Sequence, residues 1–272
     1  MLKRVVKFGL SGLLVAVLGV SAVGLTADEI LDRMDAEADA AAEGSLVATI
    51  RFENVYGDGT TASNLFGSLS KPNLSLIYFL EPDDVRGTIL LSQEGETDDE
   101  DSRIFLYLPL LGIPKELVSD EERGGSFAGS SLSYEDLGGG DDRDDFDAVV
   151  TGEEDLVLGD RTRTAYVIES TAKPGVDADT PRSVLWIDTE FFIMLKAESY
   201  NDLGNLDSTM EVLSLVEFEG RLTAEGMLAT DVSNDSSTTI TFLERHRPDA
   251  EIPDEVFSVD NLTTFDPTAW GF

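Results

Sequence analysis

The feature that most constrains the fold of this chain is an alternation of apolar and polar residues that recurs in short runs between residues 45 and 245. A period of two is typical of strands that bury one face. Turn signals such as Asp58-Gly59 separate most runs, and short turns favour antiparallel neighbours. The predicted strand segments are 45–70 (a hairpin), 74–80, 87–92, 103–108, 114–119, 146–152, 161–170, 183–188, 193–200, 207–219, 222–232 and 236–245.

These segments correspond to about eleven to thirteen strands. An open sheet of that size has to curl, close on itself or split into two sheets. No linker rich in Pro or Ser interrupts the runs, so we expect a single domain over 28–272.

One helix is predicted at 28–43, where the period changes from two to that of an amphipathic helix. Acidic residues lie opposite the apolar stripe, and Thr26 or Asp28 is in position to cap the helix. A narrow stripe of this kind is expected to cover a sheet face. Its members are Ile30, Leu31, Met34, Ala38 and Ala41.

A central loop at 124–137 separates the two sets of strands. It is rich in glycine and serine, it carries the aromatic residues Phe127 and Tyr134, and it ends in a predicted helical turn that Ser133 could cap. Long central loops are usually either functional or disordered. The aromatic residues and the sparse charge favour an ordered loop that closes over the sheet.

The first 27 residues have the layout of a secretory signal, with a basic start, an apolar run at 10–20 and small residues after it. We predict cleavage after Ala27, and cleavage after Ala22 or Gly24 is the alternative. An uncleaved N-terminal anchor is a further alternative. The domain at 28–272 is accordingly expected outside the cytoplasm.

Composition argues against several kinds of chemistry. The chain has 54 acidic and 19 basic residues, and its net charge of −35 repels nucleic acids and anionic membranes. It has no cysteine, and its one histidine, His246, cannot form a multi-histidine metal site. The acidic runs 98–101 and 141–145 lack the spacing of an EF-hand, so solvated loops are favoured over calcium sites. We therefore predict a protein that is not an enzyme and has no metal, no cofactor and no nucleic-acid partner.

Several segments, spread in order over nearly all of the chain after residue 27, carry a family resemblance. They are Asp28-Glu29-Ile30-Leu31-Asp32-Arg33-Met34-Asp35, Phe79-Leu80-Glu81-Pro82 with Arg86-Gly87-Thr88, Leu106-Tyr107-Leu108-Pro109, Gly125-Ser126-Phe127 with Gly129-Ser130, Tyr134-Glu135-Asp136-Leu137, Val184-Leu185-Trp186-Ile187-Asp188 and Ile252-Pro253-Asp254-Glu255-Val256-Phe257. Together they resemble the LolA-like, outer-membrane lipoprotein-sorting protein superfamily, in particular its longer branch.

The resemblance implies a mainly β fold with helices (α+β), in which an unclosed, strongly curved antiparallel half-barrel has the N-terminal helix and the central loop over its concave face. It also implies a monomeric periplasmic carrier for lipid or for the acyl chains of lipoproteins, which moves them towards the outer membrane. An inner-membrane transporter and an outer-membrane acceptor would be its partners.

Acyl chains need a dry concave surface, because each buried methylene contributes about 0.8 kcal/mol. Runs that are apolar on both faces suit such a surface, and the candidate wall residues are Phe66, Phe79, Leu106 and Leu108. Phe127 and Tyr134 are the candidates for the loop that closes over the mouth. For all six residues an ordinary place in the core is the alternative. The helix and the loop are both expected to shift when ligand passes.

Two other functions remain open. The concave face of a non-catalytic adaptor subunit of a membrane transporter would bind protein instead of lipid. An outer-membrane β-barrel would explain the export, the alternating strands and the terminal Trp270-Gly271-Phe272. Pro267 and the amphipathic helix argue against the barrel.

Overall fold

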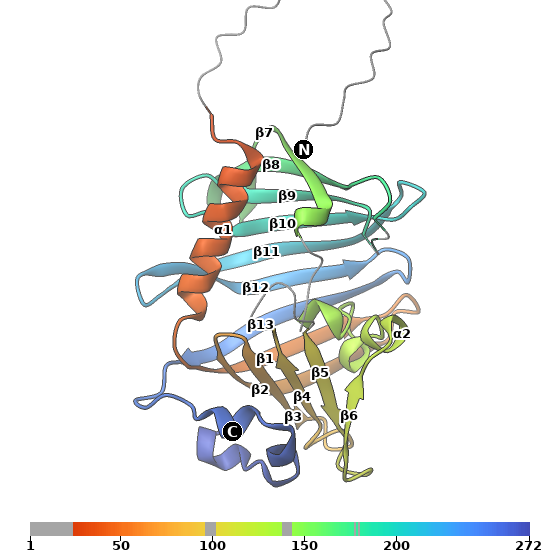
Figure 1. The fold of residues 1–272 in the computed structure, drawn as a ribbon, viewed down its shortest axis with the longest axis vertical. Coiled ribbons are helices and arrows are strands. Elements are labelled where there is room, and N and C mark those ends of the chain that lie inside the picture. The colour runs from red at the N-terminus through yellow and green to blue at the C-terminus, as the bar shows by residue number, and fades with distance from the viewer. Residues whose placement is uncertain (1–23, 96–101, 138–142, 177, 179) are drawn as a thin grey trace, which may run out of the picture.

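The computed structural model describes residues 24–95, 102–137, 143–176, 178 and 180–272. Thirteen strands form one sheet in the order β6-β5-β4-β3-β2-β1-β13-β12-β11-β10-β9-β8-β7 (Figure 1). Their bounds are β1 Leu46–Val55, β2 Thr61–Lys71, β3 Leu74–Glu81, β4 Ile89–Gln93, β5 Arg103–Tyr107, β6 Pro114–Leu117, β7 Phe146–Leu158, β8 Arg161–Ala172, β9 Arg182–Asp188, β10 Met194–Tyr200, β11 Leu206–Phe218, β12 Arg221–Asp231 and β13 Ser236–His246. The predicted number of strands is confirmed.

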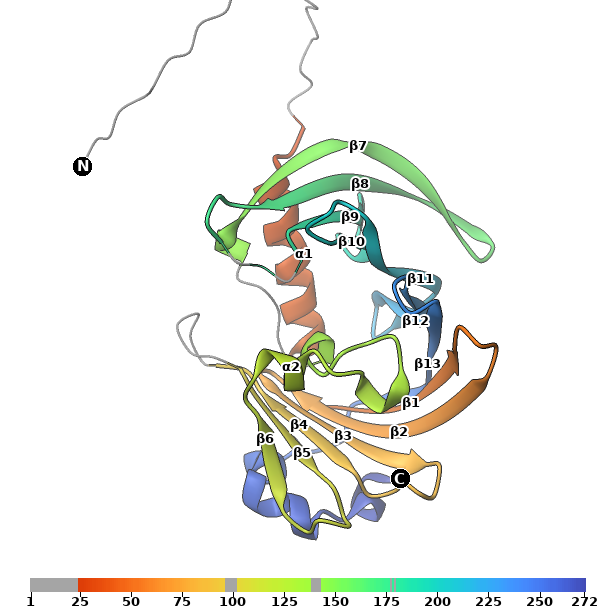
Figure 2. The same cartoon turned by 90° about the vertical axis from the view of Figure 1, so that its right-hand side faces the viewer.

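The sheet is unclosed and strongly curved. Chain neighbours pair antiparallel within β1–β6 and within β7–β13, and the pairing of β1 with β13 joins these two meanders. The edge strands are β6 and β7, which do not pair with each other. Figure 2 shows the sheet as an open curve with α1 and the central loop on its concave side. The predicted fold class is confirmed.

One strand is longer than its sequence pattern predicted. The expected segment 146–152 continues as β7 to Leu158, through the acidic stretch 153–155 that breaks the alternation. β7 is exposed on both faces over most of this length, so burial imposes no period of two there. Its register with β8 also shifts between Val150 and Gly152.

The helix α1, Ala27–Ala42, lies across the concave face of the β7–β12 half (Figure 1). Thr26 is its N-cap: the Thr26 hydroxyl accepts the Glu29 N–H at 3.2 Å, and the Glu29 carboxylate accepts the Thr26 N–H at 2.8 Å. This capping box fixes where the helix begins. The first two turns are buried in a cluster whose core is Ala27, Ile30, Leu31, Ile168 and Ile187.

The β1–β6 half of the sheet is covered on both faces. On the concave side, the central loop packs against Phe52, Phe66 and Phe79. On the outer face, the C-terminal segment packs as three 3-10 helices, η4 Asp254–Phe257, η5 Val259–Thr264 and η6 Pro267–Trp270. This double cover explains why strands such as β3 and β5 are apolar on both faces.

The terminal Phe272 belongs to this outer cover. Its ring lies over Gly67 of β2, where an added Cβ would be only 2.5 Å from the ring carbons. Glycine is therefore required at position 67 for the ring to lie flat on the strand. Lys71 holds the same segment through ion pairs with Glu251, at 3.7 Å, and with Asp254.

A buried ion pair fastens the β9–β10 turn. Asp188 is fully buried, and its carboxylate accepts hydrogen bonds from the Arg163 guanidinium at 2.6 and 2.8 Å and from the N–H groups of Glu190 and Phe191. Burial alone would raise the pKa of Asp188, but these hydrogen bonds outweigh it and hold the pKa below its ordinary value. Asp188 is thus a structural residue.

No helix among the described residues has the length and apolar character needed to cross a membrane.

Candidate functional site

An apolar cavity of about 390 Å³ lies on the concave face, between the central loop and the middle strands of the sheet. Its size falls within the range of about 300–1,000 Å³ that small-molecule sites occupy. Strands from both meanders contribute to it because β1 and β13 pair at the centre. Its apolar lining is Ile50, Phe52, Phe66, Ile77, Phe127, Leu132, Leu137, Met194, Ala197, Met210, Met227, Ala229, Ile240 and Phe242.

The central loop forms a fixed wall of this concave cavity. Phe127 is fully buried, and its ring centroid lies 5.3 Å from that of Phe66, 5.4 Å from that of Phe79 and 5.8 Å from that of Tyr134. Burial of the Tyr134 hydroxyl raises its pKa. Aromatic packing of this kind, edge to face for most of the pairs, holds the loop in the core.

Buried polar groups fasten the loop as well. The Ser131 N–H donates to the Thr238 hydroxyl at 2.8 Å, and that hydroxyl donates to the Asn54 side-chain oxygen at 2.9 Å. The Asn54 amide donates in turn to Asn64 at 3.3 Å. Breaking one link leaves buried polar groups unpaired, which costs about 1–3 kcal/mol. The predicted turn at the end of the loop is confirmed, since Ser133 accepts the Asp136 N–H at 3.0 Å.

The second half of α1, residues 35–42, lacks the burial that holds the central loop. None of its residues is buried, and five of the eight are alanines. A cavity of about 670 Å³ lies on one side of it, lined by Met34, Ala38 and Ala41, by the β9–β10 and β11–β12 turns and by the first residues of β10 and β12. This cavity shares Met194 with the concave cavity. The helix therefore stands over open space instead of packing into the sheet.

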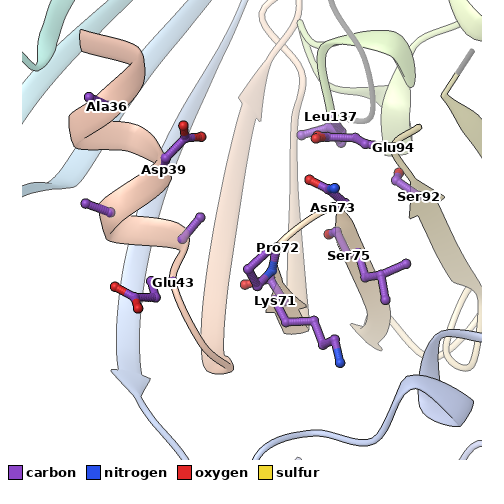
Figure 3. A pocket seen from close by; sticks show the side chains of 14 residues that line it. Ala36, Asp39, Glu43, Lys71, Pro72, Asn73, Ser75, Ser92, Glu94 and Leu137 are labelled. Atoms are coloured by element: carbon purple, nitrogen blue, oxygen red, sulfur yellow. The ribbon is translucent and has the colours of Figure 1, made fainter. Parts of the chain in front are cut away.

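A third cavity, of about 710 Å³, lies on the other side of the same half-helix. Figure 3 shows it between Asp39 of α1 and the turn at Asn73, with Glu94 and Leu137 at its far side. Leu137 also lines the concave cavity. The concave cavity thus adjoins both cavities beside the second half of α1, although no residue of α1 lines it.

Ion pairs and a hydrogen bond hold this half of α1 in place. Arg143, in the 3-10 turn before β7, pairs with Asp35 at 2.6 Å. Arg221 pairs with Glu37 at 2.7 Å. Arg247 donates to the carbonyl oxygen of Ala41 at 2.9 Å, and its own carboxylate partner, Glu219 at 2.6 Å, lies in the β11–β12 turn. Exposed pairs of this kind contribute about 0.2–1 kcal/mol each. Displacing residues 35–42 therefore costs far less than displacing the central loop.

The described residues contain no group of three or more His, Cys, Asp or Glu side chains that could hold a metal ion. The acidic run 98–101 and part of the run 141–145 lie outside the described residues.

A family model described as an uncharacterized protein matches residues 71–264 of the chain. The chain belongs to that family. Its fold is LolA-like: a LolA superfamily protein from Nitrosomonas europaea matches with a TM-score of 0.64 at 19% identity, over 87% of this chain and 99% of that one. No curated protein matches the sequence.

Two further solved structures share the fold. A DUF1329 family protein from Desulfovibrio piger matches with a TM-score of 0.75 at 24% identity, over 87% of this chain and 98% of that one. A domain from Vibrio parahaemolyticus named for outer membrane lipoprotein sorting matches with a TM-score of 0.70 at 21% identity, over 86% and 99%. The resemblance inferred from the sequence is confirmed at the level of the LolA-like fold.

The six predicted site residues occupy three different positions. Phe66 and Phe127 line the concave cavity. Phe79, Leu106 and Tyr134 belong to the same cluster of side chains. The sixth, Leu108, stands apart from the cluster, 37% exposed at the start of the β5–β6 turn.

Sequence reasoning missed the methionines. Of the five in the chain, Met194, Met210 and Met227 line the concave cavity and Met34 lines the neighbouring one. Methionine is flexible and polarisable, so it adapts to apolar ligands of varied shape. Apart from Met1, methionine occurs only in the predicted helix and in the strand segments after residue 190, and this distribution is the signal that could have indicated the site.

Proposed function

We propose that this LolA-like protein is a periplasmic carrier that shelters the acyl chain of a lipid or lipoprotein on the concave face of its sheet, without catalysing a reaction. The observation that carries the proposal is the apolar, methionine-lined cavity of about 390 Å³ at the centre of that face. The segment at 1–27, which has the layout of a secretory signal, supports the proposed periplasmic location.

The cavity suits an acyl chain in two respects. Its lining contains flexible thioethers and aromatic rings, which contact a methylene chain without requiring a fixed shape. Each methylene that leaves water contributes about 0.8 kcal/mol, so a chain of ordinary length supplies enough free energy for retention.

The entrance in this proposal is the second half of α1. The buried first two turns act as the anchor. Residues 35–42 swing away when the ion pairs of Asp35 with Arg143 and of Glu37 with Arg221 open and Arg247 releases the carbonyl oxygen of Ala41. The alanines leave room on both sides of the helix, so an acyl chain passes beside it into the centre. The central loop stays in place throughout.

Native mass spectrometry of the exported protein, purified without detergent, followed by lipid extraction, tests the proposal. We expect an acyl lipid or lipopeptide at near-stoichiometric amounts. In the variant Ala197→Phe, the new ring fills part of the cavity and should lower the bound amount severalfold. The matched control, Ala224→Phe on β12, does not line the cavity and should retain the ligand.

A folded wild-type protein that carries no acyl compound, and takes up none from added lipid, would contradict the proposal. Equal retention by the Ala197→Phe and Ala224→Phe variants would contradict the location of the site while leaving the carrier function standing.

A further inference from the structure

The β5–β6 turn and the first residue of β6, together residues 108–114, form an apolar tip. Its sequence, Leu-Pro-Leu-Leu-Gly-Ile-Pro, contains no polar or charged side chain. Leu110 is 96% exposed, Ile113 67% and Leu111 64%. Leu110 is the most exposed of the large apolar side chains in the part of the chain that the structure describes. Clustered exposure of this kind marks an interaction surface more often than scattered single residues do.

Hydrogen bonds and packing fix the conformation of this tip. The N–H groups of Leu111 and Gly112 both donate to the Leu108 carbonyl oxygen, at 2.9 and 3.1 Å. Gly112 has a positive φ of 69°, which a side chain would strain. Pro109 lies against Gly87 of the β3–β4 turn, where an added Cβ would be 3.1 Å from the proline ring. The fold therefore holds the leucines in the solvent.

The tip also lies at an extremity of the molecule. Figures 1 and 2 place the β5–β6 turn at the end opposite β7, so that it projects away from the body of the sheet. At the other end of the hairpin, Arg103 and Glu116 pair at 2.8 and 3.0 Å across β5 and β6. The hairpin thus presents a fixed, protruding, uncharged end.

We infer that this tip docks the protein onto the headgroup region of an uncharged, zwitterionic lipid bilayer. A protruding turn with several outward leucines has the shape to enter a bilayer surface, and burial of each leucine there is favourable. The net charge of −35 repels an anionic surface, so a neutral surface is the one that this uncharged tip can approach. The docking goes beyond the carrier function and does not need an occupied cavity.

Vesicle flotation tests the inference directly. The exported protein should float with phosphatidylcholine vesicles, and added phosphatidylglycerol should weaken the binding. The double variant Leu110→Ser/Leu111→Ser should bind about tenfold less or weaker still, because two apolar side chains no longer leave water. The matched control is Leu203→Ser, which replaces a leucine that is 85% exposed in the β10–β11 turn, and it should bind like the wild type.

Site-specific fluorescence adds a local measurement. The chain has no cysteine, so Leu110→Cys gives a single position for an environment-sensitive probe. The emission of that probe should shift to the blue when phosphatidylcholine vesicles are added, whereas a probe at Leu203→Cys should not respond.

Two results would overturn the inference. One is equal binding of the wild type and the tip double variant to protein-free vesicles, including no binding by either. The other is tip-dependent binding only to membranes that retain their proteins, which would make the tip a contact for a protein partner.

Discussion

Replacing Phe127 by alanine tests whether the central loop is a fixed wall or a moving lid. The ring is fully buried and lies within 5.9 Å, centroid to centroid, of the rings of Phe52, Phe66, Phe79 and Tyr134. These neighbours cannot collapse into the space, because three of them stand on paired strands. A Phe→Ala change at such a site costs about 3–5 kcal/mol of unfolding free energy. That is a large part of the about 5–15 kcal/mol typical of a folded domain.

The assay is equilibrium urea unfolding followed by circular dichroism, with the m-value checked for constancy. The matched control is Phe191→Ala in the β9–β10 turn, where the ring is 39% exposed and Arg163 lies 4.9 Å from its centroid. The loss of that exposed contact should lower the unfolding free energy by about 1 kcal/mol or less. If Phe127→Ala costs no more than Phe191→Ala, the loop spends much of its time open, and the fixed-wall argument fails.

Three further predictions concern the ends and the tethers of the fold. Asp188→Asn should lower the unfolding free energy by about 3 kcal/mol at neutral pH, because Arg163 loses its buried partner. The hydrogen bonds hold the native pKa of Asp188 below its ordinary value, so its contribution is complete above the ordinary pKa and is lost as the pH falls through the native pKa. The difference seen in urea titrations should therefore shrink in acid. A chain beginning at Asp28 should be about 1–2 kcal/mol less stable than one beginning at Val23, because it lacks the N-cap Thr26 and the buried Ala27. This cap favours the alternative cleavage after Ala22 or Gly24 over the cleavage after Ala27 that the sequence predicted, so the intact mass of the exported protein should show an N-terminus before Thr26. Arg221→Ala should speed hydrogen exchange in the second half of α1 without lowering the melting temperature measurably.

The strands were largely predictable because half-buried strands repeat with a period of two. The runs at β1 and β2 alternate clearly, and the hairpin was placed to within a residue or two. The pairing of β1 with β13 was not predictable, because pairing between distant runs leaves no trace in local periodicity. That one pairing brings the two meanders together and so creates the concave cavity.

The candidate wall was predicted only in part, for a physical reason. Phe66, predicted as wall, lines the concave cavity, whereas Leu108, also predicted as wall, lies at the exposed tip. The run 104–108 is apolar on both faces, so alternation could not tell which face was inner. The C-terminal cover, which buries Phe257 on the outer face, consists of short 3-10 helices that have no strong sequence period.

The two covers of the concave face, α1 and the central loop, are held by different interactions. For this reason we assign the movement to the second half of α1. Sequence reasoning gave the helix and the loop the same role. The loop is held by a buried ring worth about 3–5 kcal/mol and by buried hydrogen bonds. The second half of α1 is held by exposed pairs such as Arg221–Glu37, worth about 0.2–1 kcal/mol each. Because the least stable element opens first, the path that we propose for the ligand runs beside the alanines of α1. It reaches the concave cavity at Met194, which lines both that cavity and the one beside α1.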